Sequence, residues 1–419
     1  MSSRYNLGPT RARKFATRVL PLIALAIALV LIPALGPSRS MYSLMNLVGI
    51  NIVFALSYNM LLGQTGQLSF GHAVYFGLGG YGAIHAMNWI ETAAIDGGFW
   101  AAYPVFGVPV IGFAIGVLAG GVIGWPSCRR AGIPFAMISL GVAELIASAG
   151  FILVSIFGGE EGVSGDRMNG FPLFGLNLGA ISQVYWFIAF WTFVGVAAMF
   201  AFTRTPLGRM AQAVRDNAGR VQFVGYDPQH IRYLVFILSG GFAGMAGGMS
   251  AVNFEIFTPD SLSLVPSGLV LLMAYIGGAR YFAGPILGAA LLTYAQSNLS
   301  DFAEAWLLYL GLLFITVVLF APGGLAGIIL SVFNGLTRPG ARARLVQWAG
   351  QLVAGLLAMV GGVIIIEVAV RITKGYGEVY APFGVAFGPD SALTWICAGA
   401  MLCLGLSGLR WFALRGEAQ

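Results

Sequence analysis

Long runs of apolar residues, separated by short polar segments, make up most of this chain. Because lipid offers the backbone no hydrogen-bond partner, a membrane-spanning segment must be a helix of about 20 apolar residues. The runs predict an all-α protein, a polytopic transmembrane helical bundle of about 12 spans. These spans are expected at residues 19–35, 42–62, 69–90, 104–126, 132–157, 181–202, 232–254, 264–279, 282–298, 305–321, 349–370 and 391–409.

Two segments allow a second interpretation. Residues 264–279 and 282–298 are short and are separated only by Arg280 and Tyr281, so they fit either two tilted helices or one broken pair. The first span is also compatible with a cleaved signal peptide, because a basic start precedes the apolar run and residues 34–36 read Ala-Leu-Gly. Its removal would reverse the even span count that the charges support.

The charged residues indicate how the spans are oriented. Basic residues concentrate in alternate loops, and only Arg39, Arg167, Arg371 and Lys374 fall on the other side of the membrane. Acidic residues follow the opposite trend. Since cytoplasmic loops carry the excess of Lys and Arg, both termini are expected in the cytoplasm.

The composition excludes several classes of protein. Of the 419 residues, 58% are hydrophobic and only 9% are charged, against roughly 25% charge in a soluble domain. So few charges cannot cover a water-soluble fold, and such apolar content does not fit a disordered chain. The net charge of +6 comes from scattered arginines with no contiguous basic domain, so we expect no nucleic acid as a partner.

The sequence also lacks the motifs of an enzyme. A phosphate-binding loop needs Gly-Lys-Ser or Gly-Lys-Thr, and neither of the two lysines, Lys14 and Lys374, lies in such a motif. His72, His85 and His230 do not have the spacing of metal ligands. Neither β-strands nor a nucleophile motif beside a strand is predicted. We therefore expect no catalytic residues, no metal and no cofactor in this chain.

Glycines at every fourth position mark two helix faces. Transmembrane helices associate through close backbone approach, so such faces are typical of packing surfaces. We interpret them as packing surfaces and not as ligand sites. The glycines are Gly112, Gly116, Gly120 and Gly124 in one span, and Gly240, Gly244 and Gly248 in another.

A different glycine-rich stretch covers residues 63–82. Its first half also contains Gln64, Gln67, Ser69 and His72, and each glycine weakens a helix by up to about 1 kcal/mol relative to alanine. Irregular backbone at membrane depth persists only where it is buried in protein or faces a water-filled cavity. We interpret the stretch as part of a translocation path or a gate against it, with a tight helix crossing as the alternative.

Two acidic residues fall inside predicted spans. Glu144 lies at the midpoint of 132–157, where an ionised carboxylate costs about 2.5–3.5 kcal/mol unless it is paired or wetted. It is a further candidate for the translocation path, the alternative being a protonated or structurally paired carboxyl group. Glu367 lies nearer a span end beside Arg371 and is expected to reach the interface.

The long inside loop at residues 203–231 is predicted to form a helix. Thr205 supplies an N-cap and Pro206 the first helical position, while Gly225 and Pro228 predict its end. Such an amphipathic basic helix either lies on anionic lipid or inserts its apolar stripe into a partner's groove. The stripe consists of Leu207, Met210, Val214, Ala218 and Val221.

Several different sequence motifs follow one another between residues 41 and 330. The longest, Asn59–His72, reads NMLLGQTGQLSFGH, and Glu144 follows the next, Gly132–Met137. The others are Gly158–Gly165, Thr205–Arg209 with Arg215–Asn217 and Gly225, Tyr275–Arg280 with Gly284–Ala289, and Phe320–Leu325. Together they resemble the signature of bacterial ABC-transporter permeases of the branched-chain amino acid type, the LivM-like family.

The resemblance implies an importer subunit in the bacterial inner (plasma) membrane that works by ATP-driven alternating access. Its substrates would be branched-chain amino acids or similar small polar solutes, and the motifs do not separate these from urea, short amides or aromatic acids. The implied partners are a second homologous permease subunit, two cytoplasmic ATP-binding subunits and a periplasmic solute-binding protein, with membrane lipid around them. ATP hydrolysis would then take place on a separate chain.

The resemblance also assigns parts of the chain. Residues 1–18 would be a cytoplasmic tail, 19–330 the permease domain with its coupling loop 203–231, and 331–419 a cytoplasmic linker plus two extra spans. A coupling helix at 206–226 would dock on the ATPase, although it lacks the Glu-Ala-Ala motif of ABC permeases in general. Its coupling residues would be Pro206, Leu207, Gly208, Arg209, Met210, Val214, Arg215, Asp216 and Gly225. Loop 158–170 would face the binding protein, through Glu160, Glu161 and Ser164.

The main rival is a stand-alone secondary transporter or channel. Such proteins usually need ionisable residues near the midplane to couple ions, and Glu144 is the only strong candidate here. A membrane enzyme would need a clustered acid–base or metal constellation, which the sequence lacks. The importer subunit is therefore the preferred interpretation.

Overall fold

The computed structural model describes residues 23, 25–31, 33–34, 36–96, 103–169, 171, 175, 177–302, 306–320, 323–336, 341–374 and 392–417. The expected tail 1–18 lies outside these residues, and the expected first span, 19–35, lies only partly inside them. Within that span, residues 25–31 and 33–34 are helical.

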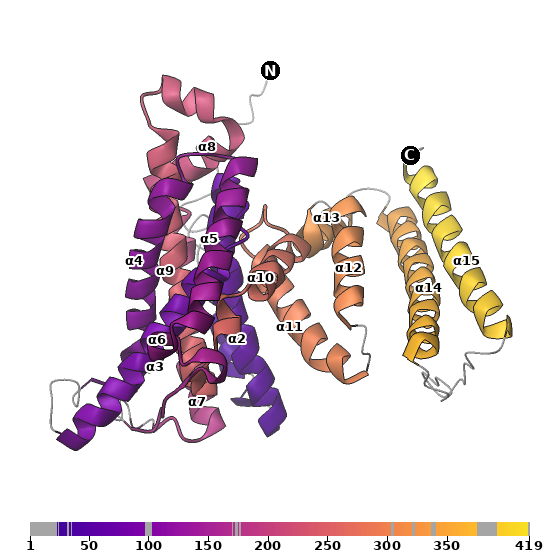
Figure 1. Ribbon diagram of the computed structural model, residues 1–419. Helices are drawn as coiled ribbons and strands as arrows, with labels where there is room; N and C mark the ends of the chain where they lie inside the picture. Colours follow the sequence, from indigo (N-terminus) through magenta and orange to yellow (C-terminus); the bar gives the residue numbers. More distant parts are fainter. Residues whose placement is uncertain are drawn as a thin grey trace. The chain divides into compact units, whose positions relative to one another are not determined.

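Helices make up nearly all of the regular structure (Figure 1). The first half of the chain contains α2 (Arg39–Asn59), the π-helical turn η1 (Met60–Thr65), α3 (Ala73–Asp96), η3 (Val105–Gly107), α4 (Val108–Ser127), α5 (Ile133–Ile152), α6 (Val154–Phe157) and η4 (Gly159–Glu161). The second half contains α7 (Ile181–Phe202), α8 (Pro206–Phe223), α9 (Pro228–Phe254), η6 (Pro259–Leu262), α10 (Leu264–Gly277), α11 (Gly284–Phe302), α12 (Trp306–Phe320), α13 (Gly324–Leu336), α14 (Ala341–Lys374) and α15 (Ala392–Glu417).

Five of the described helical segments are long and apolar enough to cross a membrane. They are Arg39–Thr65, Val105–Ser127, Ile133–Ile152, Ile181–Phe202 and Pro228–Phe254, and shorter apolar helices follow at Leu264–Gly277, Leu307–Val318, Val353–Ala369 and Trp395–Gly408. The helical membrane architecture agrees with the sequence, whereas the count of twelve spans and the cytoplasmic termini stay predictions.

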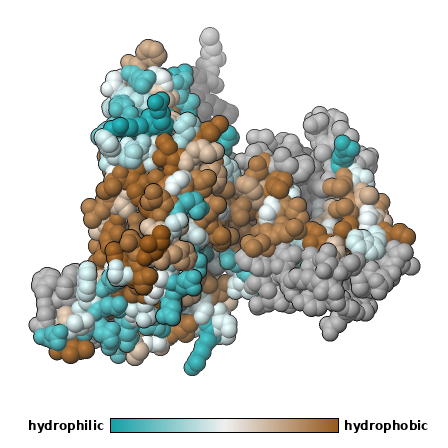
Figure 2. All heavy atoms as spheres, in the orientation of Figure 1, coloured by the Kyte–Doolittle hydropathy of each residue, from teal (hydrophilic) through white to brown (hydrophobic). Residues whose placement is uncertain are grey.

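The chain divides into two compact units. Unit 1 comprises Met1–Tyr294 and Pro322–Ala326, and unit 2 comprises Ala295–Ala321 and Gly327–Gln419. In Figure 2 the surface of unit 1 has an apolar belt between two polar ends. This pattern is typical of a membrane protein, with one polar end around α8 and the other around α6 and the loops beside it.

α2 and α9 are the inner helices of unit 1, while α4 and α5 lie at its periphery. The buried share of the most apolar stretch is 83% in α9 and 78% in the segment beginning with α2, but only 28% in the segment containing α4 and 33% in α5. The glycine faces pack as expected, because a Cβ atom at Gly112 or Gly116 would overlap backbone atoms of Gly244 or Gly240. The interpretation of these faces as packing surfaces is therefore confirmed.

A short antiparallel ladder, which the sequence did not predict, closes one end of unit 1. β1 (Val163–Ser164) pairs with β2 (Ile256–Phe257), with Val163 opposite Phe257. β2 follows directly after α9, and α8 precedes α9. Since α9 has 27 residues, the ladder and α8 lie about 40 Å apart along it.

Unit 2 contains the C-terminal hairpin of α14 and α15, which lie side by side (Figure 1). Its contacts include Gly361 against Ala398 and Gly405 against Ala358. The expectation that Glu367 reaches the membrane interface is wrong. Its side chain is only 5% exposed and accepts a hydrogen bond from the Tyr309 hydroxyl at 2.7 Å, so a partner inside unit 2 compensates for its burial.

Two helices in the C-terminal part of the chain differ from those that the sequence predicts. α13 was not predicted, and it continues to Leu336, inside the expected linker at 331–348. α14 begins at Ala341, eight residues before the expected span 349–370. The pair 264–279 and 282–298 forms two separate helices, α10 and α11.

Candidate functional site

The irregular part of the glycine-rich stretch lies between α2 and α3. α2 does not end in a simple cap but widens into the π-helical turn η1, and Gly66 then takes the left-handed conformation with φ of 70°. Residues 66–72 return along the end of α2, where the Tyr58 hydroxyl donates to the carbonyl oxygen of Ser69 at 3.1 Å. We call residues 60–72 the reversal segment. A π-helical turn is rare and is frequently found at functional sites.

Four of the candidate path residues belong to the reversal segment, and all four are buried within unit 1. Gln64 accepts a hydrogen bond from Gln212 of α8, and Gln67 contacts the thiol of Cys128 at 3.9 Å. Cys128 follows the span that ends at Ser127, and burial raises the pKa of its thiol to about 12, so it is neutral at pH 7. Gln64, Gln67, Ser69 and His72 are thus all buried in the reversal segment, where Gln64 and Gln67 have different polar partners.

Three polar atoms in the reversal segment or directly before it make no hydrogen bond with the described residues. They are Asn59 Oδ1, Ser69 Oγ and His72 Nδ1, and all three are buried. The other imidazole nitrogen, His72 Nε2, lies 2.9 Å from Ser57 Oγ, and the ring stacks on Phe54. An unsatisfied buried polar group costs about 1–3 kcal/mol. The reversal segment therefore includes two such polar atoms, Ser69 Oγ and His72 Nδ1, whose burial is not compensated by the described residues.

The second half of the glycine-rich stretch is a regular helix, so the expectation of irregular backbone is wrong for residues 73–82. Here the glycines serve close packing within unit 1. A Cβ at Gly79 would overlap the backbone of Gly244 in α9, and one at Gly80 would overlap the ring of Phe257. Over these residues the alternative interpretation, a tight helix crossing, describes the structure.

Glu144 lies apart from the other candidate path residues. The buried side of α5 carries Ala136, Ser139, Ala143, Ala147 and Gly150. Glu144 lies on the opposite, exposed side with Met137, Gly141 and Ser148. Its carboxylate makes no hydrogen bond or ion pair with the described residues, and a Cβ at Gly141 would meet no atom within 4 Å. α5 itself touches the reversal segment, because Ser139 Oγ accepts from the amide of Phe70 at 3.1 Å.

α8 begins as the sequence predicts but contains a break. The Thr205 hydroxyl accepts from the amide of Gly208 at 3.1 Å, and Pro206 is the first helical residue. Asn217 then leaves the helical conformation, with φ of −162° and ψ of 97°, and its Oδ1 accepts from the amide of Arg220 at 2.9 Å. Asn217 therefore acts as an N-cap for a second short helix. The chain turns at Gly225, where φ is +91°, and α9 starts at Pro228.

The apolar stripe of α8 packs on unit 1 itself. Val214 is 2% exposed and Val221 is 4% exposed, and α8 contacts both α9 and η1. The interpretation that this stripe is free to enter a partner's groove is therefore wrong for these residues. Of the expected coupling residues, Gly208 is also buried, and Leu207 and Met210 are partly buried. The exposed ones are Pro206, Arg209, Arg215, Asp216 and Gly225.

Sequence reasoning missed an exposed apolar cluster at the end of α8. Phe223 is 94% exposed, and Val224 and Tyr226 beside it are also largely exposed. These three residues form what we call the α8 tip. Because the helix breaks at Asn217, these residues do not follow the helical spacing that Leu207, Met210 and Val214 share. The sequence did contain a signal for this break. Asn217 is an N-cap residue in the middle of the predicted helix, and the aromatic residue Tyr226 follows Gly225 directly.

α8 also contacts the reversal segment through two side chains. Gln212 Nε2 donates to Gln64 Oε1 at 2.7 Å, and Arg215 Nη1 donates to the carbonyl oxygen of Gly63. Arg215 also forms an ion pair with Asp216 at 3.0 Å, on the exposed side of the helix. The guanidinium group therefore bridges the outer surface of α8 and the backbone of η1.

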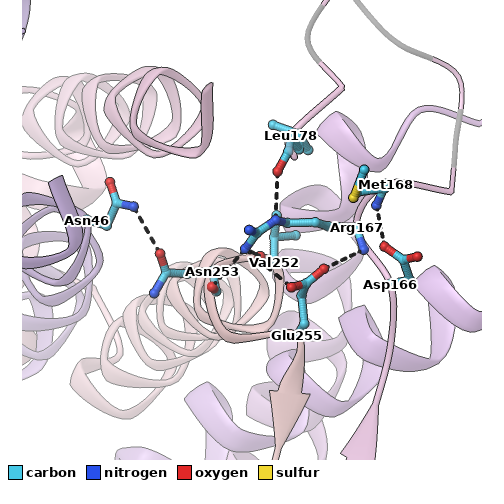
Figure 3. Close-up of polar contacts among 8 residues, drawn as sticks. All are labelled: Asn46, Asp166, Arg167, Met168, Leu178, Val252, Asn253 and Glu255. Atoms are coloured by element: carbon cyan, nitrogen blue, oxygen red, sulfur yellow. Dashed lines mark hydrogen bonds and ion pairs between the residues drawn. The ribbon is translucent and has the colours of Figure 1, made fainter. Parts of the chain in front are cut away.

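The expected binding-protein loop lies at the opposite end of unit 1. Glu160, Glu161 and Ser164 are exposed there. Arg167, which was not singled out from the sequence, fixes the loop to the end of α9 (Figure 3). Its Nε donates to the carbonyl of Leu178 at 2.7 Å, and its Nη1 lies 3.6 Å from Glu255 Oε2.

Further hydrogen bonds hold this loop in a defined conformation. The Arg167 amide donates to Glu255 Oε1 at 3.1 Å, and its Nη1 donates to the carbonyl of Asn253 at 3.1 Å. Asn253 accepts from Asn46 of α2 at 3.1 Å, so the network reaches a second helix (Figure 3). Charge-assisted bonds of this kind are stronger than neutral ones. The exposed acidic residues are therefore presented on an ordered surface.

Comparison with known proteins gives one family. The sequence model described as "Branched-chain amino acid transport system / permease component" matches residues 40–322. The High-affinity branched-chain amino acid transport system permease protein LivM of Escherichia coli (strain K12) is 27% identical over 327 residues, which cover 73% of this chain and 74% of the relative. The protein of the same name from Salmonella typhimurium is 26% identical, with 69% and 70% covered.

A more distant relative carries a different subunit name. The Probable branched-chain amino acid transport permease protein LivH of Methanocaldococcus jannaschii is 26% identical over 167 residues, or 38% of this chain and 51% of the relative. No solved structure gives a significant match.

Proposed function

The chain belongs to the family of permease components of branched-chain amino acid transport systems, and from this we propose that it is the transmembrane subunit of an ATP-driven importer. It would move branched-chain amino acids or similar small polar solutes across the bacterial inner membrane. The names of the LivM relatives support the substrate class. The chain encodes no phosphate-binding loop, so ATP hydrolysis belongs to a partner chain.

The observation that carries this proposal is the form of α8. It is a helix outside the apolar belt, held to unit 1 by its buried face and exposing Arg209, Asp216 and the α8 tip. A cytoplasmic ATPase needs such a fixed contact, because motion passes to the membrane helices only if the docked helix is itself attached to them. Apolar side chains exposed next to charged ones are also typical of protein–protein contact sites.

A second subunit of the permease type completes the path. An ionised Glu144 on an exposed helix face at mid-span would cost about 2.5–3.5 kcal/mol in lipid. We place the α5 face with Gly141, Glu144 and Ser148 toward a cavity between two permease subunits, where water and polar partners remove that cost. The similarity to a LivH protein supports a homologous second subunit.

The opposite end of unit 1 would receive the solute-binding protein. Glu160, Glu161 and Ser164 are exposed on the loop that Arg167 fixes. A rigid docking loop limits the entropy lost on association. With the α8 end in the cytoplasm, this loop faces the periplasm, as the charge distribution predicts.

Co-purification with the ATP-binding subunits of the same importer tests the proposal. Tagged wild-type chain should retain both ATP-binding subunits in detergent, and Phe223→Asp should lose them because a charge then replaces the most exposed apolar side chain of the α8 tip. Ile95→Asp is the matched control, since Ile95 is 82% exposed at the opposite end of unit 1. Retention by Phe223→Asp would contradict docking at the tip.

Transport in proteoliposomes separates the importer from a stand-alone transporter. Uptake should require ATP, the ATP-binding subunits and the solute-binding protein. Glu144→Gln should lower uptake by about tenfold without lowering the Tm, because the side chain is exposed and unpaired with described residues. Uptake by the chain alone, driven by a proton gradient and unaffected by ATP, would overturn the proposal in favour of a secondary transporter.

A further inference from the structure

We propose that the reversal segment is the element that α8 moves, and that Gln212 and Arg215 are the positioning residues that join the two. This inference rests on the proposed function, because it assumes that an ATPase docks on α8. It adds the route by which the movement of α8 enters the membrane domain and the element at which it arrives.

The two contacts are well placed for this role. Gln212 binds the side chain of Gln64, and Arg215 binds the carbonyl oxygen of Gly63, so both grip the same π-helical turn. Val214 lies between Gln212 and Arg215 in the sequence, and its side chain is buried within unit 1. A displacement of the first half of α8 therefore acts on η1 directly, without an intervening helix.

The backbone of η1 is crowded from the other side. A Cβ at Gly63 would overlap both Asn59 Oδ1 and the carbonyl oxygen of Ala279, in the turn between α10 and α11. On the side of α8, a Cβ at Gly66 would lie 3.0 Å from Cγ of Arg215. η1 thus lies between α8 and the α10–α11 turn, and it cannot follow a shift of α8 without changing its own conformation.

The reversal segment has the features of an element that can adopt two backbone conformations. A π-helical turn can convert to an α-helical one by moving a single residue out of the turn. In the present arrangement three polar atoms, Asn59 Oδ1, Ser69 Oγ and His72 Nδ1, are buried without a hydrogen bond to the described residues. A second arrangement that supplies partners for them would compensate for the breaking of other contacts. Small shifts at one site become discrete changes when a packed element is bistable.

Movement of the reversal segment would affect transport through its own polar residues and through its contact with α5. The segment carries the buried polar residues Gln64, Gln67, Ser69 and His72. Its Phe70 and Gly71 contact Ser139 on the buried side of α5. The exposed side of α5 bears Glu144. Movement of the reversal segment therefore shifts the helix that we place along the path, and α8 controls that movement through two side chains.

Side-chain replacement in the reconstituted complex tests the link. Arg215→Met keeps an unbranched side chain but removes the charge and all donors, so uptake per ATP hydrolysed should fall by about tenfold while the ATP-binding subunits still co-purify. Arg215→Lys keeps a positive charge and a donor nitrogen, and it should restore part of the coupling. A normal ratio of uptake to hydrolysis in Arg215→Met would overturn the inference.

Gln212 allows a test with a matched control. Gln212→Leu removes the bond to Gln64 and should also lower uptake per ATP hydrolysed. Gln222→Leu makes the same replacement on the exposed surface of α8 and should leave that ratio at the wild-type value. Equal effects of the two variants would show that the bond to Gln64 has no special part in coupling.

Cross-linking replaces the Gln212–Gln64 hydrogen bond by a covalent connection. Gln64→Cys with Gln212→Cys, in a chain whose Cys128, Cys397 and Cys403 are replaced by alanine, should show low uptake per ATP hydrolysed while the two thiols are free. A short cleavable thiol cross-linker that joins the pair should raise this ratio, and reduction of the linker should lower it again. The same ratio before and after cross-linking would overturn the inference.

The outcomes distinguish this inference from the proposed function. If the wild-type chain fails to retain the ATP-binding subunits, the importer proposal fails. If it retains them and imports, but the Gln212 and Arg215 variants couple normally and cross-linking changes nothing, only the link through the reversal segment fails.

Discussion

Residues 60–72 and residues 73–82 are both rich in glycine, yet the first stretch leaves the α-helix and the second keeps it. In the helical stretch, Gly79 and Gly80 meet α9 and the ring of Phe257 at distances that exclude a side chain. In the reversal segment, Gly63 and Gly66 lie at a π-helical turn and a left-handed residue. The same residue type thus serves close packing in one place and backbone conformation in the other.

The difference shows that glycine content does not decide whether a membrane segment is helical. What decides is where the backbone finds its hydrogen-bond partners. The helical stretch satisfies its own groups, so its glycines are free to bring α3 and α9 together. The reversal segment depends on side chains of other elements, among them Tyr58 and Ser139, for its carbonyl and amide groups.

The largest expected effect comes from filling a packing glycine. Gly79→Leu places a side chain against the backbone of Gly244, which cannot rotate away. Overpacking of this kind should destabilise the protein by about 3 kcal/mol or more. A thermal unfolding curve in detergent, followed by size-exclusion chromatography, measures the loss.

Gly141→Leu is the control for that variant. A Cβ at Gly141 meets no atom within 4 Å, so its Tm should stay close to the wild-type value even if transport falls. A comparable loss in both variants would mean that the leucine side chain, and not the crossing of α3 with α9, causes the instability.

A smaller effect is expected from the hydrogen bond that joins Ser57 of α2 to His72 of the reversal segment. Ser57 Oγ donates to the carbonyl of Phe54 at 2.7 Å, so His72 Nε2 must donate to Ser57 Oγ. Ser57→Ala leaves that buried imidazole donor without a partner and should cost about 1–3 kcal/mol. The Tm of Ser57→Ala measures this, with Ser148→Ala on the exposed side of α5 as the control.

The smallest effect is expected at Ser69. Its hydroxyl is buried and makes no hydrogen bond with the described residues, so Ser69→Ala removes a group that already lacks compensation. The Tm should stay within the equivalent of about 1 kcal/mol of wild type or rise. A loss as large as that of Ser57→Ala would show that Ser69 Oγ has a partner on which the segment depends.

The sequence predicted those elements whose boundaries have local chemical causes. The span at 181–202 coincides with α7, because the apolar run is bounded by Gly179 and Arg204. Thr205 and Pro206 marked the start of α8 for the same reason, since an N-cap and a first-turn proline act within one turn.

Features that depend on contacts between distant residues were not predicted. Helical spacing identified the stripe containing Val214 but not the body on which it packs, which is this chain itself. Glu367 was assigned to the interface from its distance to a span end, whereas Tyr309, which lies 58 positions away in the sequence, holds it inside. The π-helical turn likewise has no periodic signal, because it comes from one extra residue held by contacts with α8 and α9.

α9 runs without a break between the two polar ends of unit 1. Gly240, Gly244 and Gly248 lie close against backbone atoms of α4. Side chains add to the same contact, because Phe242 packs on Phe113 and the Tyr233 hydroxyl donates to the carbonyl oxygen of Gly121. The Arg167 network lies at one end of α9 and the short turn to α8 at the other. The two polar surfaces of unit 1 are therefore connected by a single continuous helix.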